Sequence, residues 1–257
     1  MALTKEWDKL NGFRCGKGVL SLYLNTFESQ GGQWQIRLKN GLKKLDEYIE
    51  LAGGEKELRS YRQLKKKVSK EIQNQKGNFE RGLLVFASVD EKIFIIKTLP
   101  FEVKNEFHWE QVPVTKQLKE IKAKYPRSGI VVVQQRDILT LDVTLGEITE
   151  EKYYSFELDE MAWKEHDGIA ASDREASSAN HVDKIAKRQE ENQRRWLKEI
   201  VPLLEQEATQ KQWKGIYIVG PAEQVKDMKS RINTKVFKTI PKNLFSKPNH
   251  EIIKEVI

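Results

Sequence analysis

The chain has one cysteine, few histidines and no long apolar run, and each of these shortages excludes a class of protein. Cys15 alone can form neither an intrachain disulfide nor a metal cluster built on several cysteines. The histidines are scattered without metal-ligand spacing: His108, His166, His181 and His250. The longest apolar stretches, such as 83–87 and 130–133, are far shorter than the about 20 residues of a membrane-spanning helix. Residues 1–13 do not read as a signal peptide. We therefore expect a cytoplasmic protein with no metal, no cofactor and no membrane span.

Charge is abundant, and its balance is basic. The 257 residues include 45 Lys and Arg against 38 Asp and Glu, which gives a formal net charge of +7 and a pI near 9.2. A basic balance favours nucleic acid or an anionic surface as the partner. About 39% of the residues are hydrophobic, enough for one large domain or two of ordinary size.

The first half of the chain alternates strand and helix patterns. Leu38, Leu42, Leu45 and Ile49 recur at spacings of three and four, which is typical of an amphipathic helix. The predicted elements, in chain order, are a strand at 18–26, helices at 34–51 and 58–72, a hairpin at 81–88 and 93–99, and a short helix at 114–125. The second helix also carries a run of cations on its other faces: Lys56, Arg59, Arg62, Lys65, Lys66, Lys67 and Lys70.

The second half predicts a mixed sheet. Three strand-like segments at 129–135, 138–144 and 152–158 have the spacing of an antiparallel meander. A polar stretch at 159–178 follows, and then come a long helix at 179–211, a strand at 215–220, a helix at 221–233 and a strand at 235–240. This order implies a mixed sheet with packed helices, ribonuclease H-like in outline. We expect an α/β protein with two domains, at residues 1–126 and 127–245, and a C-terminal tail at 246–257.

The long helix separates apolar from basic residues. On a helical wheel one arc is apolar: Val182, Ile185, Trp196, Ile200, Leu203 and Leu204. The opposite arc is basic: Lys184, Lys187, Arg188, Arg194, Arg195 and Lys198. Six cations on one face match the electrostatic footprint of a nucleic-acid binder. The alternative is a solvated face, partly neutralised by Glu190, Glu191 and Glu199.

Three segments carry a resemblance to a known superfamily. They are "SGIVVVQQRDILTLDVTLGEITEEKYYSFEL", "HVDKIAKRQEENQRRWLKEIVPLL" and "WKGIYIVGPAEQVKDMKSRI". Together they resemble the central domain of the archaeo-eukaryotic class I release factor and Pelota superfamily. The strand at 18–26, the helix segment at 34–45 and the strand at 81–88 look like the first domain of its bacterial release-factor-like members. The resemblance extends to about residue 245, after which we expect no room for the superfamily's C-terminal domain.

The resemblance places the superfamily's Gly-Gly-Gln just before the long helix, where this chain reads "EASSAN" at 175–180. Glycines let bare backbone approach the ester, and Ser177-Ser178-Ala179 supplies neither glycine nor glutamine. The acidic character of residues 157–175 should also repel a tRNA acceptor end. Gly31-Gly32-Gln33 lies in the other domain, where we expect a connection into a helix that Gln33 opens.

We therefore expect a translation-associated, non-hydrolytic, release-factor-like protein that contacts tRNA or the ribosome through basic helix faces. Two alternatives remain: an active peptidyl-tRNA hydrolase that rescues ribosomes, and a protein-interaction module with no RNA role. A two-metal nuclease is disfavoured because Asp137 and Asp142, five positions apart, project to opposite faces of a strand.

Overall fold

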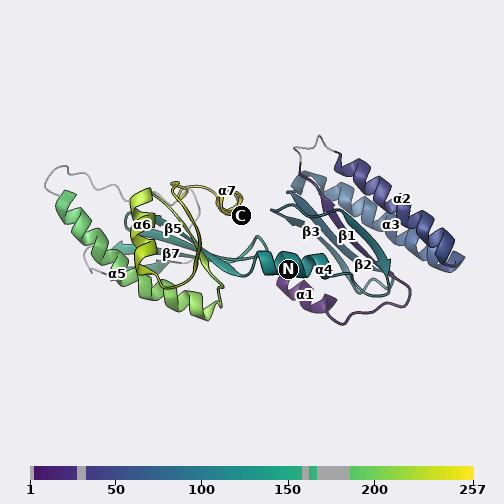
Figure 1. Cartoon of the computed structure of the whole chain (residues 1–257), viewed down its shortest axis with the longest axis horizontal. Coiled ribbons are helices and arrows are strands. Elements are labelled where there is room, and N and C mark those ends of the chain that lie inside the picture. Colours follow the sequence, from purple (N-terminus) through teal and green to yellow (C-terminus); the bar gives the residue numbers. More distant parts are fainter. Residues whose placement is uncertain (1–2, 28–32, 158–161, 167–185) are drawn as a thin grey trace. The chain divides into compact units, whose positions relative to one another are not determined.

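The computed structural model describes residues 3–27, 33–157, 162–166 and 186–257 (Figure 1). The chain divides into two compact units, Met1–Lys124 and Tyr125–Ile257. Each unit is built on its own sheet with helices packed against it. The expected class, α/β with mixed and antiparallel sheets, is confirmed.

Unit 1 contains a four-stranded antiparallel sheet in the order β3-β2-β1-β4. Its strands are β1 (Val19–Asn25), β2 (Gly82–Ser88), β3 (Phe94–Leu99) and β4 (Glu106–Glu110). Helices α2 (Trp34–Ala52) and α3 (Glu55–Gln75) run side by side over one face (Figure 1). The short helices are α1 (Leu3–Leu10), η2 (Lys76–Asn78) and α4 (Lys116–Lys124).

The predicted amphipathic patterns explain why α2 and α3 lie on this sheet. The buried residues of α2 are Leu38, Leu42, Leu45 and Ile49, and those of α3 are Tyr61, Leu64, Val68 and Ile72. They form one core with Leu20, Leu22 and Leu24, which share one face of β1 because strand side chains alternate. The opposite side of each helix is left in water.

Unit 2 contains a six-stranded sheet in the order β10-β9-β5-β6-β7-β8. Its strands are β5 (Ser128–Gln134), β6 (Asp137–Thr144), β7 (Glu147–Glu157), β8 (Ala162–His166), β9 (Ile216–Val219) and β10 (Val236–Ile240). Strands β5 to β8 pair antiparallel, whereas β9 pairs parallel with both β5 and β10. The predicted mixed sheet with an antiparallel meander is confirmed, and its ribonuclease H-like outline stays a prediction.

Helices cover both faces of this second sheet. Helices α5 (Ala186–Gln210) and α6 (Ala222–Arg231) pack on the face that carries Val131 and Val133. Helix α7 (Asn249–Val256) packs on the face that carries Ile130 and Val132. The last residues of the chain are therefore folded onto unit 2, with Ile252 fully buried.

Some elements differ from the sequence-based expectation. The stretch 159–178, expected to be a polar loop, contains the edge strand β8, which pairs with the end of β7. Helix α1 and strand β4 occupy segments for which no regular structure was predicted. Short elements give few periodic positions, and an edge strand such as β8 is decided by pairing with a neighbour rather than by a strong local pattern.

Candidate nucleic-acid interface and its supporting network

Helix α5 presents two different faces where its side chains are described. Arg195 and Lys198 are exposed, whereas Trp196 and Ile200 are buried. The guanidinium of Arg195 lies 3.3 Å from the carboxylate of Glu199, in a surface i,i+4 pair. Lys198 forms no ion pair with any side chain that the structure describes. Two of the six predicted contact residues are thus placed on the solvent face.

The other four predicted contact residues are not placed in side-chain detail. Lys184 lies outside the described residues. Lys187, Arg188 and Arg194 lie on α5, but their side chains are outside the described part of the structure. Their contribution to the basic face stays a prediction.

Trp196 anchors the opposite face of α5, as predicted. It is 7% exposed, and its ring lies 5.0 Å from the ring of Phe156 on β7, measured between centroids. Aromatic side chains bury more apolar surface than other residues, so this contact fixes which side of the helix faces the sheet. Arg195 and Lys198, on the far side, are consequently directed into solvent.

The predicted apolar arc is wrong at Leu203, which is 42% exposed. The buried side of α5 instead follows Leu197, Val201, Leu204 and Ala208, at helical spacings of four and three. Leu203 follows Trp196 by one heptad, and a straight helix drifts by about 20° over that distance. Since Trp196 already lies at the border of the buried side, that drift moves Leu203 into water. The other two predicted members, Val182 and Ile185, lie outside the described residues.

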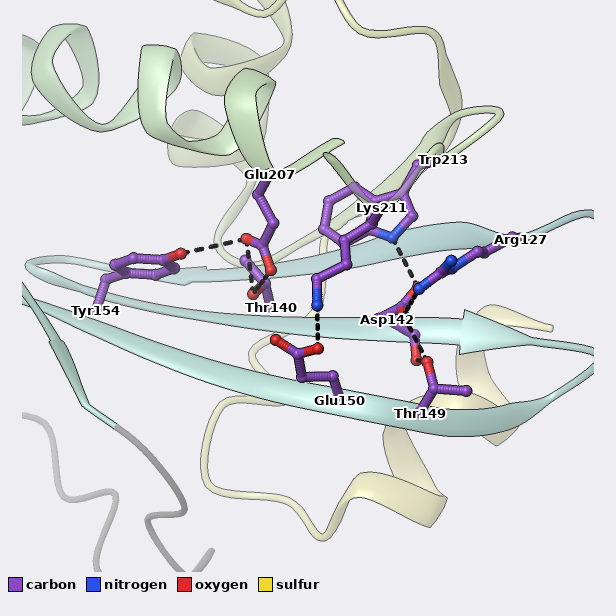
Figure 2. A network of polar contacts seen from close by, with 9 residues as sticks. All are labelled: Arg127, Thr140, Asp142, Thr149, Glu150, Tyr154, Glu207, Lys211 and Trp213. Carbon is purple, nitrogen blue, oxygen red and sulfur yellow. Dashed lines mark hydrogen bonds and ion pairs between the residues drawn. The ribbon is translucent and has the colours of Figure 1, made fainter. Parts of the chain in front are cut away.

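Beneath the C-terminal end of α5, the carboxylate of Asp142 accepts four hydrogen bonds (Figure 2). Arg127 donates from Nε at 2.9 Å and from Nη2 at 2.5 Å, Thr149 Oγ1 donates at 2.5 Å, and Trp213 Nε1 donates at 2.8 Å. Burial alone would raise the pKa of Asp142, but the hydrogen bonds from Arg127, Thr149 and Trp213 together hold that pKa below its usual value. Asp142 is therefore a buried, fully paired carboxylate.

Glu207 approaches the same sheet face from α5 itself. Its side chain points from the helix onto the strands in Figure 2, and the residue is 5% exposed. Thr140 Oγ1 lies 3.2 and 3.1 Å from its two carboxylate oxygens, and the hydroxyl of Tyr154 donates at 3.3 Å. Burial raises the pKa of Glu207 above its ordinary value, and the Thr140 hydrogen bond opposes that rise only in part.

An ion pair and a close ring contact complete this network. Lys211, just beyond α5, pairs with Glu150 of β7 (Figure 2). The ring of Trp213 lies directly over Gly129 of β5, where an added Cβ would come within 2.4 Å of it. The end of α5 is thus attached to β5, β6 and β7. A carboxylate with four donors has little capacity left for a ligand, so the network positions α5 and is not itself a ligand site.

Sequence reasoning missed most of this network. One signal was present in the sequence: the polar residues Thr140 and Asp142 lie among the apolar residues of β6. All eight residues of this strand are buried. Buried polar groups require hydrogen-bond partners. The partners themselves were not readable, because Glu207 lies 67 positions from Thr140 and Trp213 lies 71 positions from Asp142.

The two aspartates weighed for metal binding lie on opposite faces of β6, as their spacing predicts. Asp142 faces Trp213 on the α5 side, whereas Asp137 accepts a hydrogen bond of 2.6 Å from Tyr153, which packs on the α7 side. Among the described residues, no three His, Cys, Asp or Glu side chains are grouped to hold a metal ion. Cys15 is buried.

The Gly-Gly-Gln tripeptide of the N-terminal half is only partly visible. Gly31 and Gly32 lie outside the described residues. Gln33 is exposed and occupies the N-cap position of α2, where its carbonyl accepts a hydrogen bond of 3.0 Å from the backbone N–H of Arg37. Its side chain makes no capping hydrogen bond. Gln33 thus opens the helix, as expected, and residues 175–180 before α5 lie outside the described part.

Within the described ranges, none of the helices combines the length and the apolar composition needed to span a bilayer.

Comparison with known proteins adds independent findings. The model of a family described as Bacterial archaeo-eukaryotic release factor family 5 matches residues 126–257. The uncharacterized protein YocB of Bacillus subtilis (strain 168) is 30% identical over 246 residues, which are 93% of this chain and 91% of that protein.

Solved structures show a weaker likeness. One is the archaeal translation termination factor aRF1, which is 14% identical, with a TM-score of 0.37 over 98% of this chain and 71% of that one. Another, described as an archaeal protein, is 13% identical, with a TM-score of 0.37 over 93% of this chain, and the chain spans 65% of its length.

Proposed function

The chain belongs to bacterial archaeo-eukaryotic release factor family 5, and on that basis we propose that it is a translation-associated protein that contacts the phosphates of tRNA or ribosomal RNA through basic helix faces. The observation that carries the proposal is the orientation of α5. Arg195 and Lys198 are exposed on one side, while Trp196 and Ile200 bind the other side to the sheet. The contact takes place in the cytoplasm.

The buried network makes this face a rigid one. Asp142, Glu207 and Lys211 connect the C-terminal end of α5 to β6 and β7, so rotation of that end of the helix would break these hydrogen bonds and this ion pair. Phosphate contacts that are held in place before binding cost less ordering entropy when the RNA arrives. Such contacts position a protein on a nucleic acid and do not read its sequence.

We also propose that the protein does not hydrolyse peptidyl-tRNA. The position before α5 where the superfamily carries Gly-Gly-Gln reads Ser177-Ser178-Ala179. Without glycines the backbone cannot come as close to the ester bond. Gly31-Gly32-Gln33 does not replace it, because Gln33 serves as the N-cap of α2 in the other unit.

Co-sedimentation with ribosomes tests the RNA contact. The wild-type protein should pellet with ribosomes at about 50 mM salt and dissociate as salt is raised, because cation–phosphate contacts release counterions. Replacing Arg195 and Lys198 with Gln should weaken binding and flatten the salt slope by up to about two units. The matched control replaces Lys242 and Lys247, which pair with Glu255 and Glu251, with Gln. The control should bind as wild type does.

Binding that is equally strong in the wild type and the Arg195/Lys198 variant would contradict the proposed RNA face and favour a protein-interaction module. The Arg195–Glu199 pair is the observation that supports that second candidate, since it partly neutralises the face. Release of a labelled peptide from stalled ribosomes by the wild-type protein would instead contradict the non-hydrolytic proposal.

A further inference from the structure

The helix pair of unit 1 carries an excess of positive charge. Residues 34–78, which form α2, α3 and η2, contain twelve Lys and Arg against six Asp and Glu. The difference of +6 compares with +7 for residues 211–247 of unit 2, which contain nine Lys and Arg against two Asp and Glu. The helix pair is therefore one of the strongly basic stretches of the chain, where an anionic partner is attracted.

Only α3 turns this excess into a continuous row. Lys56, Arg59, Gln63, Lys66 and Lys70 succeed one another at steps of three and four, so they form one line along the helix. All five are exposed, on the side opposite the buried Tyr61, Leu64, Val68 and Ile72. We call the four cations of this line, Lys56, Arg59, Lys66 and Lys70, the α3 basic stripe. At 1.5 Å per residue the stripe extends for about 21 Å.

The cations of the stripe are free of strong partners, unlike their neighbours on α3. Arg62 and Lys65 reach back to Asp46 of α2, and Lys67 pairs with Glu91 of the turn between β2 and β3. These flanking cations help to hold unit 1 together.

Lys56, Lys66 and Lys70, by contrast, form no ion pair with any side chain in the described part of the chain. Arg59 pairs only with Glu55, and both side chains are at least 80% exposed, so solvent screens that pair strongly. Folding alone therefore gives the stripe no partner.

The outer face of the neighbouring helix α2 has a different character. Lys43 is paired with Glu47, Lys39 and Lys44 are exposed without an ion pair to any described side chain, and the exposed Ile36 and Leu51 are apolar. The free cations of α2, Lys39 and Lys44, are five positions apart and do not form a line along the helix, whereas those of α3 do.

We propose that the α3 basic stripe is a second phosphate-binding surface, which lies along the sugar-phosphate backbone of an RNA. A stripe of about 21 Å is long enough to contact several successive phosphates of one strand. Three of its four cations are lysines, which act as point charges on phosphate and do not recognise planar groups. The surface therefore binds RNA independently of its sequence.

An acidic protein is a poorer match for the stripe than a phosphate backbone. Protein interfaces depend on buried aromatic or apolar anchors at their centre. The stripe has no such anchor, because the residue between Arg59 and Lys66 in this line is the polar Gln63. An amide side chain of this kind can itself contact phosphate. The choice of RNA over DNA rests on the proposed function, because phosphate contacts alone do not separate the two.

Fluorescence anisotropy with a labelled RNA hairpin tests the proposal on the full-length protein. The test variant carries Lys56→Gln, Lys66→Gln and Lys70→Gln. The matched control carries Lys43→Gln, Lys242→Gln and Lys247→Gln, which remove the same charge from lysines that are already paired. Glutamine is nearly as good a helix former as lysine, so α3 is retained. Circular dichroism verifies the fold, and a milder variant, Lys66→Gln with Lys70→Gln, serves if the triple variant is unstable.

The test variant should bind the hairpin at least about tenfold more weakly at about 50 mM salt, and its salt slope should flatten by about two to three units. The control should remain within about twofold of wild type. Equal losses in both variants would mean that only net charge matters and would overturn the stripe. Tighter binding of labelled polyglutamate than of the hairpin, abolished in the test variant, would also overturn it and identify an acidic protein as the partner.

The same measurement on the Arg195/Lys198 variant separates this inference from the proposed function. If the α5 variant binds RNA weakly and the stripe variant binds normally, the stripe is refuted and the α5 face stands. If neither variant differs from wild type, both are refuted. Binding that depends on the stripe alone supports the inference and contradicts the α5 face.

Discussion

Replacing Asp142 with Asn removes the charge at the centre of the buried network and leaves the shape of the side chain unchanged. Hydrogen bonds to charged groups each contribute about 1.5–3 kcal/mol, and removing one partner of a buried ion pair costs about 3–5 kcal/mol. Two features reduce the cost here. The Arg127 side chain is 40% exposed, so water can solvate it once it is freed. The Asn carbonyl oxygen still accepts from Trp213 or Arg127. We expect a loss of about 2–3 kcal/mol in the free energy of unfolding at neutral pH.

The pH dependence of this loss identifies its cause. The pKa of Asp142 is lowered in the folded state, so its contribution is present above the unfolded pKa of about 3.9 and is lost as pH falls through the folded pKa. Below that pH the protonated wild-type side chain resembles Asn. The difference in stability between wild type and Asp142→Asn should therefore be constant above about pH 5 and should shrink only below about pH 4.

Urea unfolding of both proteins over this pH range measures the difference. Hydrogen exchange provides the internal control, since the amides of β1 and β2 in unit 1 should keep wild-type protection in the variant. A difference below about 0.5 kcal/mol at pH 7 would refute the argument, because it would mean that the four hydrogen bonds carry no net stability. A difference that persists unchanged to about pH 3 would show that the charge of Asp142 is not what is lost.

Three further predictions concern single residues. Burial raises the folded-state pKa of Glu207, so the contribution of this residue to stability is full below the unfolded pKa of about 4.3 and is lost as pH rises through the folded pKa. In urea unfolding, Glu207→Gln should therefore become more stable relative to wild type as pH rises. A difference in stability that stays constant with pH would contradict this prediction. Trp196→Ala should cost about 3–5 kcal/mol in the same assay, because it empties the contact with Phe156; a cost below about 1 kcal/mol would mean that α5 is anchored elsewhere. Gln33→Ala should change the free energy of unfolding by less than about 0.5 kcal/mol, because the Gln33 side chain makes no cap hydrogen bond; a larger loss would reveal a structural role for it.

Strongly periodic segments could be predicted because one local pattern decided them. The spacing of Leu38, Leu42, Leu45 and Ile49 predicts α2, and these residues are its buried set. The strands of the second half were predicted in the same way, from apolar runs bounded by turns. The candidate contact residues Arg195 and Lys198 followed from the same wheel that correctly buried Trp196.

Elements and contacts that depend on distant neighbours could not be predicted. Strand β8 exists because the end of β7 pairs with it. Leu203 looked buried on an ideal wheel, but the sheet meets α5 on the side of Leu197 and Val201, which only packing could show. The basic character of α3 was visible in the sequence, whereas the division of its cations into paired and free ones required the positions of Asp46 and Glu91.

The sequence by itself determined the α/β class, the order of the strongly periodic elements and the segregation of charge along individual helices, because periodicity and charge are local properties of the chain. The tertiary structure alone decided which charges are neutralised and which remain free for a ligand. Glu207 and Trp213 form hydrogen bonds with Thr140 and Asp142 of β6, which lie about 70 positions earlier in the chain. Helix α5, which packs across the sheet, brings these residues together. Buried polar groups are satisfied by neighbours in space, and spatial neighbours far apart in the chain leave no pairing signal in a single sequence.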